Sequence, residues 1–288
     1  MLSEIDYAKR AREAHLNVHF IAEGTREGEI RLQRVNPATP CCNSYSIAKL
    51  FSVTALGILF DRGLVTPETR VHALLWDLFP AEYDPRWEKV TLDHIMRHRI
   101  GLAADCIDID NLSGETYPSE LDYLALLLSK PLPDEPGTVY KYNDAGYYLL
   151  SRVIERISGK DPAALLRPIL METMGFRELA WSVCPKGYAI GATGLYLYTE
   201  DLVKLGILYL CGGVWKGKRI LSSEWIDTVL DRGYEMTPKG GGWYGKGGMR
   251  GQMLAIHPTL GRAVAWHSCD SVAFDKIIFE EDTRGAAK

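Results

Sequence analysis

The chain has 288 residues, of which 47% are hydrophobic and 24% are charged, and its net charge is −4 at pH 7. This length allows one large domain or two interleaved ones, and the hydrophobic content is ample for a buried core. No basic stripe or acidic block is present, so we expect no nucleic-acid partner. No segment approaches 18 consecutive apolar residues, so we expect no membrane-spanning helix and no membrane partner.

The N-terminus lacks the basic and apolar regions of a secretory signal, which predicts a cytoplasmic protein unless a leader is missing from this sequence. The six cysteines form no C-x-x-C pair, which favours free thiols over disulfides or a metal site. We expect neither a metal nor an organic cofactor. The sequence leaves the oligomeric state open.

Strands and one buried helix are predicted in the first part of the chain. Residues 3–15 are typical of an amphipathic helix with Ser3 as its cap. Strands are predicted over 17–22 and 29–33, with a glycine-containing turn between them. Apolar residues then recur at three- and four-residue intervals over 47–60, which predicts a buried helix.

The middle of the chain is predicted to be mostly helical, and strands return near its end. The predicted helices cover 91–98 with Thr91 as cap, 117–128, 146–159, 162–171, 199–210 with Thr199 as cap, and 222–230. The predicted strands cover 253–257 and 262–267, whereas 272–279 fits either a helix or a strand. We therefore predict an α/β (α+β) fold, with one sheet built from N- and C-terminal segments and a helical insertion.

Ser46 and Lys49 form the only Ser-x-x-Lys motif in the chain, at the start of the buried helix. Three-residue spacing on a helix places both side chains on one face. A lysine partly desolvated by apolar neighbours can accept the serine proton and so activate a nucleophile, and the helix N-terminus favours a developing oxyanion. The alternative is an exposed cap serine followed by a lysine that extends to water. The motif alone does not separate the two.

Several motifs in order resemble those of the serine β-lactamase-like hydrolases. This family includes class C β-lactamases, D-alanyl-D-alanine carboxypeptidases, esterases and 6-aminohexanoate-dimer hydrolase. Ser46–Lys49 is similar to the first family motif, and Tyr142-Asn143-Asp144 is similar to the Tyr-x-Asn motif, with Asp144 where asparagine is usual. The segment 90–102 also resembles a family segment, and the resemblance covers about residues 40–265.

The third family motif, Lys-Thr-Gly or His-x-Gly on a strand, has two possible registers here. Lys246-Gly247-Gly248 is the preferred match, although Gly247 replaces the hydroxyl residue of the family. The alternative register is Met249-Arg250-Gly251. A cation on this strand would hold a substrate carboxylate or act on the tyrosine, which is why the first register is preferred.

The resemblance implies a β-lactamase/transpeptidase-like fold with an antiparallel sheet. The sheet-containing α/β subdomain is expected over 1–70 and 190–288, the helical subdomain over 71–189, and the active site at their interface. Ser46 is the implied nucleophile, Lys49 assists its deprotonation, and Tyr142 relays protons. The backbone N–H groups of Ser46 and Met249 are the implied oxyanion donors.

Other residues are candidates for substrate binding, each with a structural alternative. They are Asp144, Lys246, Gly248, Met249, Trp243 and Arg250. An anion at Asp144 favours the charged form of Lys49, which either moves the base role to Tyr142 or makes Asp144 a contact for a substrate amine. His94 and His98 are four apart, but no third ligand follows, so a structural role is expected for both.

The sequence thus predicts a serine hydrolase that cleaves a small ester, amide or peptide through a Ser46 acyl-enzyme. Carboxypeptidase activity or weak β-lactamase activity is compatible with the same chemistry. Two alternatives stay open, namely a non-catalytic penicillin-binding or sensor module, and an acyltransferase that uses the same serine. The resemblance supports the class of chemistry and does not identify the natural substrate.

Overall fold

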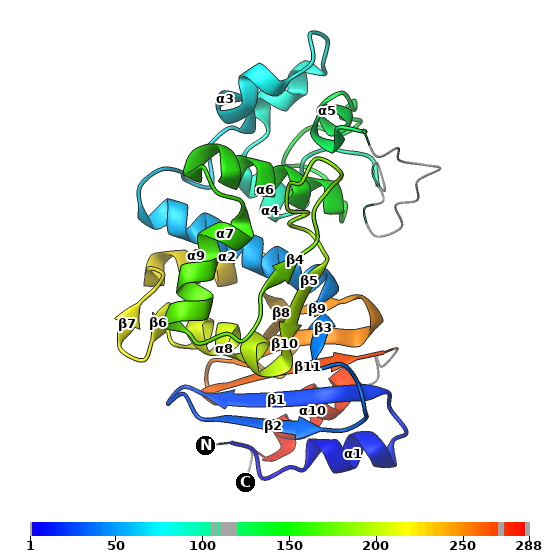
Figure 1. Cartoon of the computed structure of the whole chain (residues 1–288), viewed down its shortest axis with the longest axis vertical. Helices are drawn as coiled ribbons and strands as arrows, with labels where there is room; N and C mark the ends of the chain where they lie inside the picture. The colour runs from blue at the N-terminus through cyan, green and yellow to red at the C-terminus, as the bar shows by residue number, and fades with distance from the viewer. Residues whose placement is uncertain (1, 105–106, 108, 110–119, 270–273, 286–288) are drawn as a thin grey trace. The chain divides into compact units, whose positions relative to one another are not determined.

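A computed structural model describes residues 2–104, 107, 109, 120–269 and 274–285 (Figure 1). The chain forms two compact units whose segments alternate along the sequence. Unit 1 consists of Met1–Ile47, Pro168–Ala180 and Leu195–Lys288, and unit 2 consists of Ala48–Arg167 and Trp181–Gly194. The first boundary falls before the buried helix rather than at residue 70, because that helix packs with the other helices of unit 2.

Unit 1 contains a six-stranded antiparallel sheet in the order β2-β1-β11-β10-β9-β8. Its strands are β1 (Val18–Thr25), β2 (Ile30–Arg34), β8 (Thr237–Gly240), β9 (Trp243–Gly248), β10 (Gln252–His257) and β11 (Arg262–Ser268). The N- and C-terminal segments meet where β1 pairs with β11, with Ala22 opposite Ala265. The prediction of one sheet built from both ends of the chain is therefore confirmed.

Helix α8 (Thr199–Leu210) covers one face of this sheet (Figure 1). A Cβ atom on Gly206 would lie 2.9 Å from Cδ1 of Leu254 on β10. On β1, a Cβ atom on Gly24 would lie 2.6 Å from Cδ1 of Ile207 on the helix. Both distances are too short for a side chain, so the two glycines allow the helix and the sheet to approach closely.

The opposite face packs against α1 (Tyr7–Glu13) and α10 (Phe274–Gly285). Trp243 and Trp266 lie in this core, and the Trp266 ring meets Phe274 edge-on at 5.1 Å between centroids. Burying one such aromatic side chain contributes about 2–3 kcal/mol. The segment 272–279 is thus helical from Phe274 onward, whereas 272 and 273 lie outside the described residues.

The remaining elements of unit 1 are short, apart from one three-turn helix. They are β3 (Cys41–Asn43), β4 (Ala180–Trp181, whose second residue belongs to unit 2), β5 (Leu195–Tyr198), β6 (Val214–Trp215), β7 (Lys218–Arg219), α9 (Ser223–Arg232), a π-helix (Pro168–Thr173) and the 3-10 helices η1 (Tyr45–Ile47) and η5 (Met249–Gly251). Strand β3 pairs antiparallel with β5, and this pairing leads the chain into η1.

Unit 2 is helical and is organised around α6 (Asp144–Ser158), which contacts the other α-helices of the unit. These are α2 (Ala48–Asp61), α3 (Val71–Leu75), α4 (Leu92–Met96), α5 (Tyr123–Leu128) and α7 (Pro162–Arg167), with the 3-10 helices η2 (Trp76–Leu78) and η3 (Pro85–Lys89). All residues of α2 from Ala48 to Leu59 are buried, so this helix has no solvent-facing stripe. No helix in the described ranges combines the length and apolar character that a bilayer-spanning segment requires.

Some helix boundaries differ from those predicted. Helix α1 begins at Tyr7 rather than residue 3, because the Asp6 carboxylate, and not Ser3, accepts the N–H of Lys9. The predicted cap at Thr91 is confirmed, since its hydroxyl accepts the N–H of His94. The predicted helix 117–128 begins at Tyr123, and its first three residues lie outside the described part of the chain.

Candidate active site

The turn that carries Ser46 is held by hydrogen bonds within unit 1. Tyr45 adopts a positive φ of 46°, which is unfavourable for a non-glycine residue. The side chain of Asn43 accepts the N–H of Tyr45 at 2.8 Å, and the carbonyl of Ser44 accepts the N–H of Ile47 at 3.1 Å. A backbone conformation of this kind persists only where its surroundings enforce it, and such residues concentrate at functional sites.

A buried histidine supports the same turn from the sheet. His267 on β11 contacts the hydroxyl of Ser44 through Nε2 at 3.0 Å and the hydroxyl of Thr199 through Nδ1 at 2.8 Å. Burial lowers the pKa of His267 to about 3, with repulsion from His19 as a smaller cause. The ring is therefore neutral at pH 7, and the hydroxyls can match the donor and acceptor that a neutral imidazole presents. Thr199, predicted as a helix cap, instead contacts this histidine, and α8 has no side-chain cap.

We expect His267 to make the fold sensitive to acid. The folded protein binds fewer protons at this ring than the unfolded chain, whose histidine pKa is near 6.5, so stability falls as pH drops from 6.5 toward 3. The expected loss attributable to this ring is about 2 kcal/mol at pH 5. Urea unfolding at pH 7 and pH 5 measures it, and His267→Gln should remove this part of the pH dependence. An NMR titration in which the folded ring protonates above pH 5 would contradict this account.

Strand β9 carries the third motif beside the Ser46 turn, and both β9 and β10 contact η1. A Cβ atom on Gly248 would lie 2.5 Å from the carbonyl oxygen of Ser44, so only glycine fits there. A Cβ atom on Gly247 would meet nothing closer than 3.5 Å, so the family's hydroxyl residue is not excluded by space. Lys246 and Gly248 share one face of β9, since side chains alternate along a strand.

The other candidates of unit 1 lie around the end of β9. Met249 and Arg250 belong to the turn η5, where Arg250 has a positive φ of 60°. Lys246-Gly247-Gly248, by contrast, is in the strand, as the family pattern requires, which favours that register. Trp243 is 1% exposed and lies in the core cluster on the other face of the sheet. We therefore leave Trp243 out of the proposed site.

Unit 2 brings together Lys49, Tyr142 and Asp144. Lys49 is fully buried in the first turn of α2, and its Nζ lies 2.5 Å from Oδ1 of Asp144. The same nitrogen donates to the carbonyl of Ala192 at 3.0 Å and lies 4.8 Å from the centroid of the Tyr142 ring. These contacts suit an ammonium group, because a carboxylate, a carbonyl and an aromatic face all attract a cation.

The start of α6 explains why these residues converge. Asn143 caps the helix by accepting the N–H of Gly146 through its side chain at 3.2 Å. Asp144 then occupies the first helical position, where the helix dipole stabilises a negative charge. A Cβ atom on Gly146 would lie 2.8 Å from Cδ1 of Ile100, so this turn of α6 packs tightly on the segment after α4.

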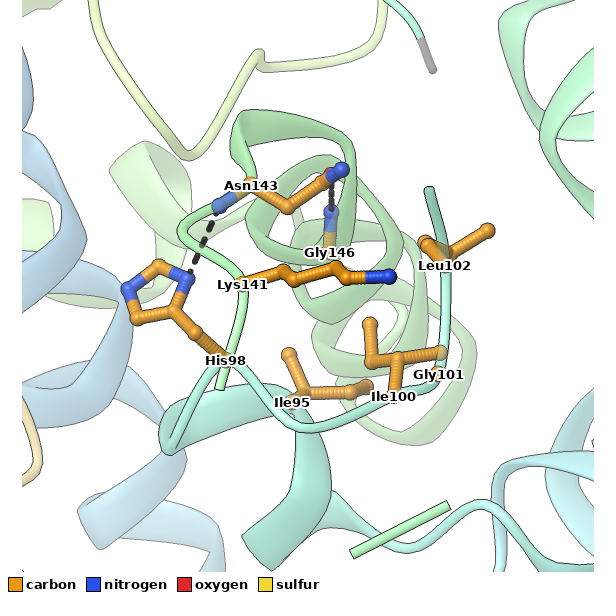
Figure 2. A pocket seen from close by; sticks show the side chains of 8 residues that line it. All are labelled: Ile95, His98, Ile100, Gly101, Leu102, Lys141, Asn143 and Gly146. Carbon is orange, nitrogen blue, oxygen red and sulfur yellow. Dashed lines mark hydrogen bonds between the residues drawn. The ribbon is translucent and has the colours of Figure 1, made fainter. Parts of the chain in front are cut away.

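That segment contains His98, which contacts the chain on both sides of Tyr142. Its carbonyl accepts the N–H of Lys141 at 2.8 Å, and its Nδ1 accepts the N–H of Asn143 at 3.2 Å (Figure 2). Its ring stacks on Tyr142, with 4.4 Å between centroids and 30° between planes. Figure 2 shows the hydrogen bond between His98 and Asn143 at a small pocket lined by Ile95, His98, Ile100, Gly101, Leu102, Lys141, Asn143 and Gly146. His98 therefore fixes the position of Tyr142.

We expect His98 to affect catalysis through Tyr142, the residue that the resemblance implies as a proton relay. His98 has a positive φ of 55°, which glycine and asparagine tolerate, so His98→Gly and His98→Asn test the ring without new backbone strain. The glycine variant should lose about tenfold or more in kcat, since small displacements of a catalytic group are costly. Asparagine offers an oxygen near the place of Nδ1 and should recover most of that loss with KM little changed. Equal activity of wild type and His98→Gly would contradict this role.

Sequence reasoning missed the residues that support the candidates. His267 and Ser44 are 223 positions apart, and no spacing pattern links them. His98 was assigned to the face of a helix with His94, but α4 ends at Met96 and His98 lies beyond it. Glu235, which forms an ion pair with Lys246 at 2.5 Å, belongs to no motif. The one signal in the sequence was a polar residue next to a motif, such as Asn43, whose side chain supports the Ser46 turn.

Comparison with known proteins shows that a single family model matches most of the chain. The model of the Beta-lactamase family matches residues 32–273. A 6-aminohexanoate-dimer hydrolase of Paenarthrobacter ureafaciens is 25% identical over 199 residues, which cover 65% of this chain and 50% of that protein. The chain thus spans half the length of this curated relative.

Solved structures show the same fold. A Bacillus anthracis protein provisionally named 6-aminohexanoate-dimer hydrolase superposes with a TM-score of 0.78 at 16% identity, over 96% of this chain and 80% of that one. A family VIII carboxylesterase superposes with a TM-score of 0.71 at 16% identity, over 92% of this chain and 90% of that one. At these identities the likeness establishes the fold, and the expected β-lactamase/transpeptidase-like architecture is confirmed.

Proposed function

Because this chain belongs to the Beta-lactamase family, we propose that it is a serine hydrolase that cleaves esters or small amides through an acyl-enzyme on Ser46. The observation that supports this most strongly is the environment of Lys49, three positions after Ser46. Lys49 is fully buried, and its ammonium group contacts both the Asp144 carboxylate and the face of Tyr142. A buried lysine held in this way is unusual outside a functional site.

In the proposed reaction Tyr142 is the general base and Lys49 remains an ammonium ion. The Ser46 hydroxyl gives its proton to the side-chain oxygen of Tyr142, and Oγ forms a bond to the substrate carbonyl carbon. Collapse of the tetrahedral intermediate breaks the bond to the leaving group, which takes the proton from Tyr142. Water then attacks the acyl-enzyme by the same proton route and releases the acid. Asp144 supports this division of roles, since its carboxylate, 2.5 Å from Nζ, holds the lysine nitrogen beside the Tyr142 ring.

The remaining candidates are proposed to bind the substrate. The backbone N–H groups of Ser46 and Met249 are the proposed oxyanion donors. Gly248 allows β9 to approach the Ser46 turn, which supports a place for Met249 near the nucleophile. Lys246 and Arg250 are the proposed polar contacts at the end of β9.

The proposal is tested by trapping the acyl-enzyme and by turnover. A fluorophosphonate should add one label per chain, detected by intact-protein mass, and a series of p-nitrophenyl esters should be hydrolysed with a preference that reports the acyl site. Labelling by penicillin without turnover would favour the sensor module instead. Transfer of the acyl group to an added alcohol in place of water would favour an acyltransferase. If folded protein is labelled neither by the fluorophosphonate nor by penicillin, the proposal is refuted.

A further inference from the structure

Glu235 and Lys246 form a nearly buried ion pair beside the proposed nucleophile. The two side-chain atoms lie 2.5 Å apart, Glu235 Oε2 to Lys246 Nζ, and the residues are 6% and 8% exposed. Glu235 follows α9, in the turn that leads into β8, and Lys246 is in β9, so both belong to unit 1. The Lys49–Asp144 pair, by contrast, belongs to unit 2.

The strand register places Lys246 on the face that approaches the Ser46 turn. Lys246 lies opposite Leu254 of β10, whose side chain contacts α8 at Gly206. Gly248, two positions later and therefore on the same face, meets the carbonyl oxygen of Ser44. The side chains at the alternate positions of β9, such as Trp243, point to the other face of the sheet, into the core with α1 and α10. A substrate carboxylate that approached β9 from the nucleophile would meet the Lys246 side of the strand.

Glu235 is held in place at an energetic cost. Its φ is 65°, a left-handed conformation that costs a non-glycine residue about 1–2 kcal/mol, and its N–H donates to the carbonyl of Gly233 at 2.8 Å. Burying two charges is also costly unless they are paired well. A strained, buried carboxylate aimed at the third-motif lysine is difficult to explain as ordinary packing.

We propose that Glu235 occupies the place of a substrate carboxylate on Lys246, so that the site takes acyl donors that are uncharged at this position and discriminates against carboxylate-bearing ones. This inference rests on the proposed function and narrows its substrate class. The Lys239 ammonium group also interacts electrostatically with Lys246 and Glu235. A second carboxylate would have to displace Glu235 or remain next to it, and both are unfavourable.

The test compares two esters of equal length, p-nitrophenyl butyrate and the p-nitrophenyl half-ester of succinate, which differ by the distal carboxylate. A ratio of kcat/KM values cancels differences in the folded fraction of each variant. Wild type should prefer the butyrate by about tenfold or more, and Glu235→Gln should narrow that preference by about tenfold, because the carboxylate paired with Lys246 is removed. The double variant Glu235→Gln/Lys246→Met carries neither charge. It should lose the increase in relative kcat/KM for the succinate half-ester that Glu235→Gln alone produces.

Arg250 provides a matched control. It is the other proposed cation near the end of β9, and its guanidinium donates to Cys269 Sγ at 3.5 Å. Because Arg250 is proposed to contact both esters alike, Arg250→Ala should change both rates in parallel and leave their ratio unchanged. A wild-type enzyme that hydrolyses both esters equally, a Glu235→Gln variant that changes both rates in parallel, or a ratio that responds to Arg250→Ala instead would each overturn the proposal. Hydrolysis of both esters that persists in Ser46→Ala would refute the proposed function itself, whereas Ser46-dependent hydrolysis without discrimination refutes this inference alone.

Discussion

Ser46→Ala is expected to abolish labelling by fluorophosphonate and to lower kcat/KM for esters by about a thousandfold or more. Without the hydroxyl no acyl-enzyme forms, and only substrate binding and the oxyanion donors remain. The turn should persist, because the Asn43 side chain accepts the N–H of Tyr45 and the Ser44 carbonyl accepts the N–H of Ile47. Intact-protein mass and initial rates measure the two effects.

Ser44→Ala is the matched control, because it removes a hydroxyl two positions away in the same turn. Ser44 is fully buried against His267, so it should not be the labelled residue. This variant should keep the adduct and most of its stability at pH 7. An adduct that is lost with Ser44 and kept with Ser46→Ala would place the nucleophile elsewhere and would reject the central assignment.

The sequence predicted the sheet and the motif-bearing segments because each leaves a local signal. Apolar residues at helical spacing marked α2, short apolar segments on either side of a Pro258–Gly261 turn marked β10 and β11, and the Thr91 cap marked the start of α4. The boundary of unit 2 was not predicted, because α2 is buried on all sides and its sequence does not show which helices surround it. Local patterns show that a segment is buried but not which partner covers it.

The same distinction between local patterns and tertiary contacts applies to the candidate site. Ser46, Lys49 and Tyr142 were selected by motifs, whereas the residues that orient or neutralise them come from distant segments. His98 reaches Tyr142 from 44 positions earlier, and Glu235 reaches Lys246 across the turn into β8. Such contacts depend on tertiary packing, and a single sequence carries no periodicity that reports them. The departure at Asp144 was visible in the sequence, but its role stayed open between an anion near Lys49, a contact for a substrate amine and a plain turn or cap residue. The ion pair with Lys49 came from the structure.

Lys49→Met should damage catalysis and stability together, and a second substitution should separate the two effects. Removing the ammonium leaves Asp144, which is 16% exposed, as a largely buried carboxylate without its cation. The expected cost in the free energy of unfolding is about 2–4 kcal/mol, which urea titration measures. The rate of ester hydrolysis should fall by about a hundredfold to a thousandfold, the range typical of a lost electrostatic contact at a reacting group, because the cation beside Tyr142 is gone.

Adding Asp144→Asn to Lys49→Met removes the unpaired charge and retains the shape of the side chain. Replacing both members of a buried pair is far less destabilising than removing one, so most of the unfolding free energy should return. The ester hydrolysis rate should not return, because the cation beside Tyr142 is still absent. A double variant that regains activity would show that Lys49 acts only as the partner of Asp144. Unchanged stability in Lys49→Met would show instead that the Lys49–Asp144 pair contributes little to the fold. It would contradict the expectation that Lys49 acts in both stability and catalysis.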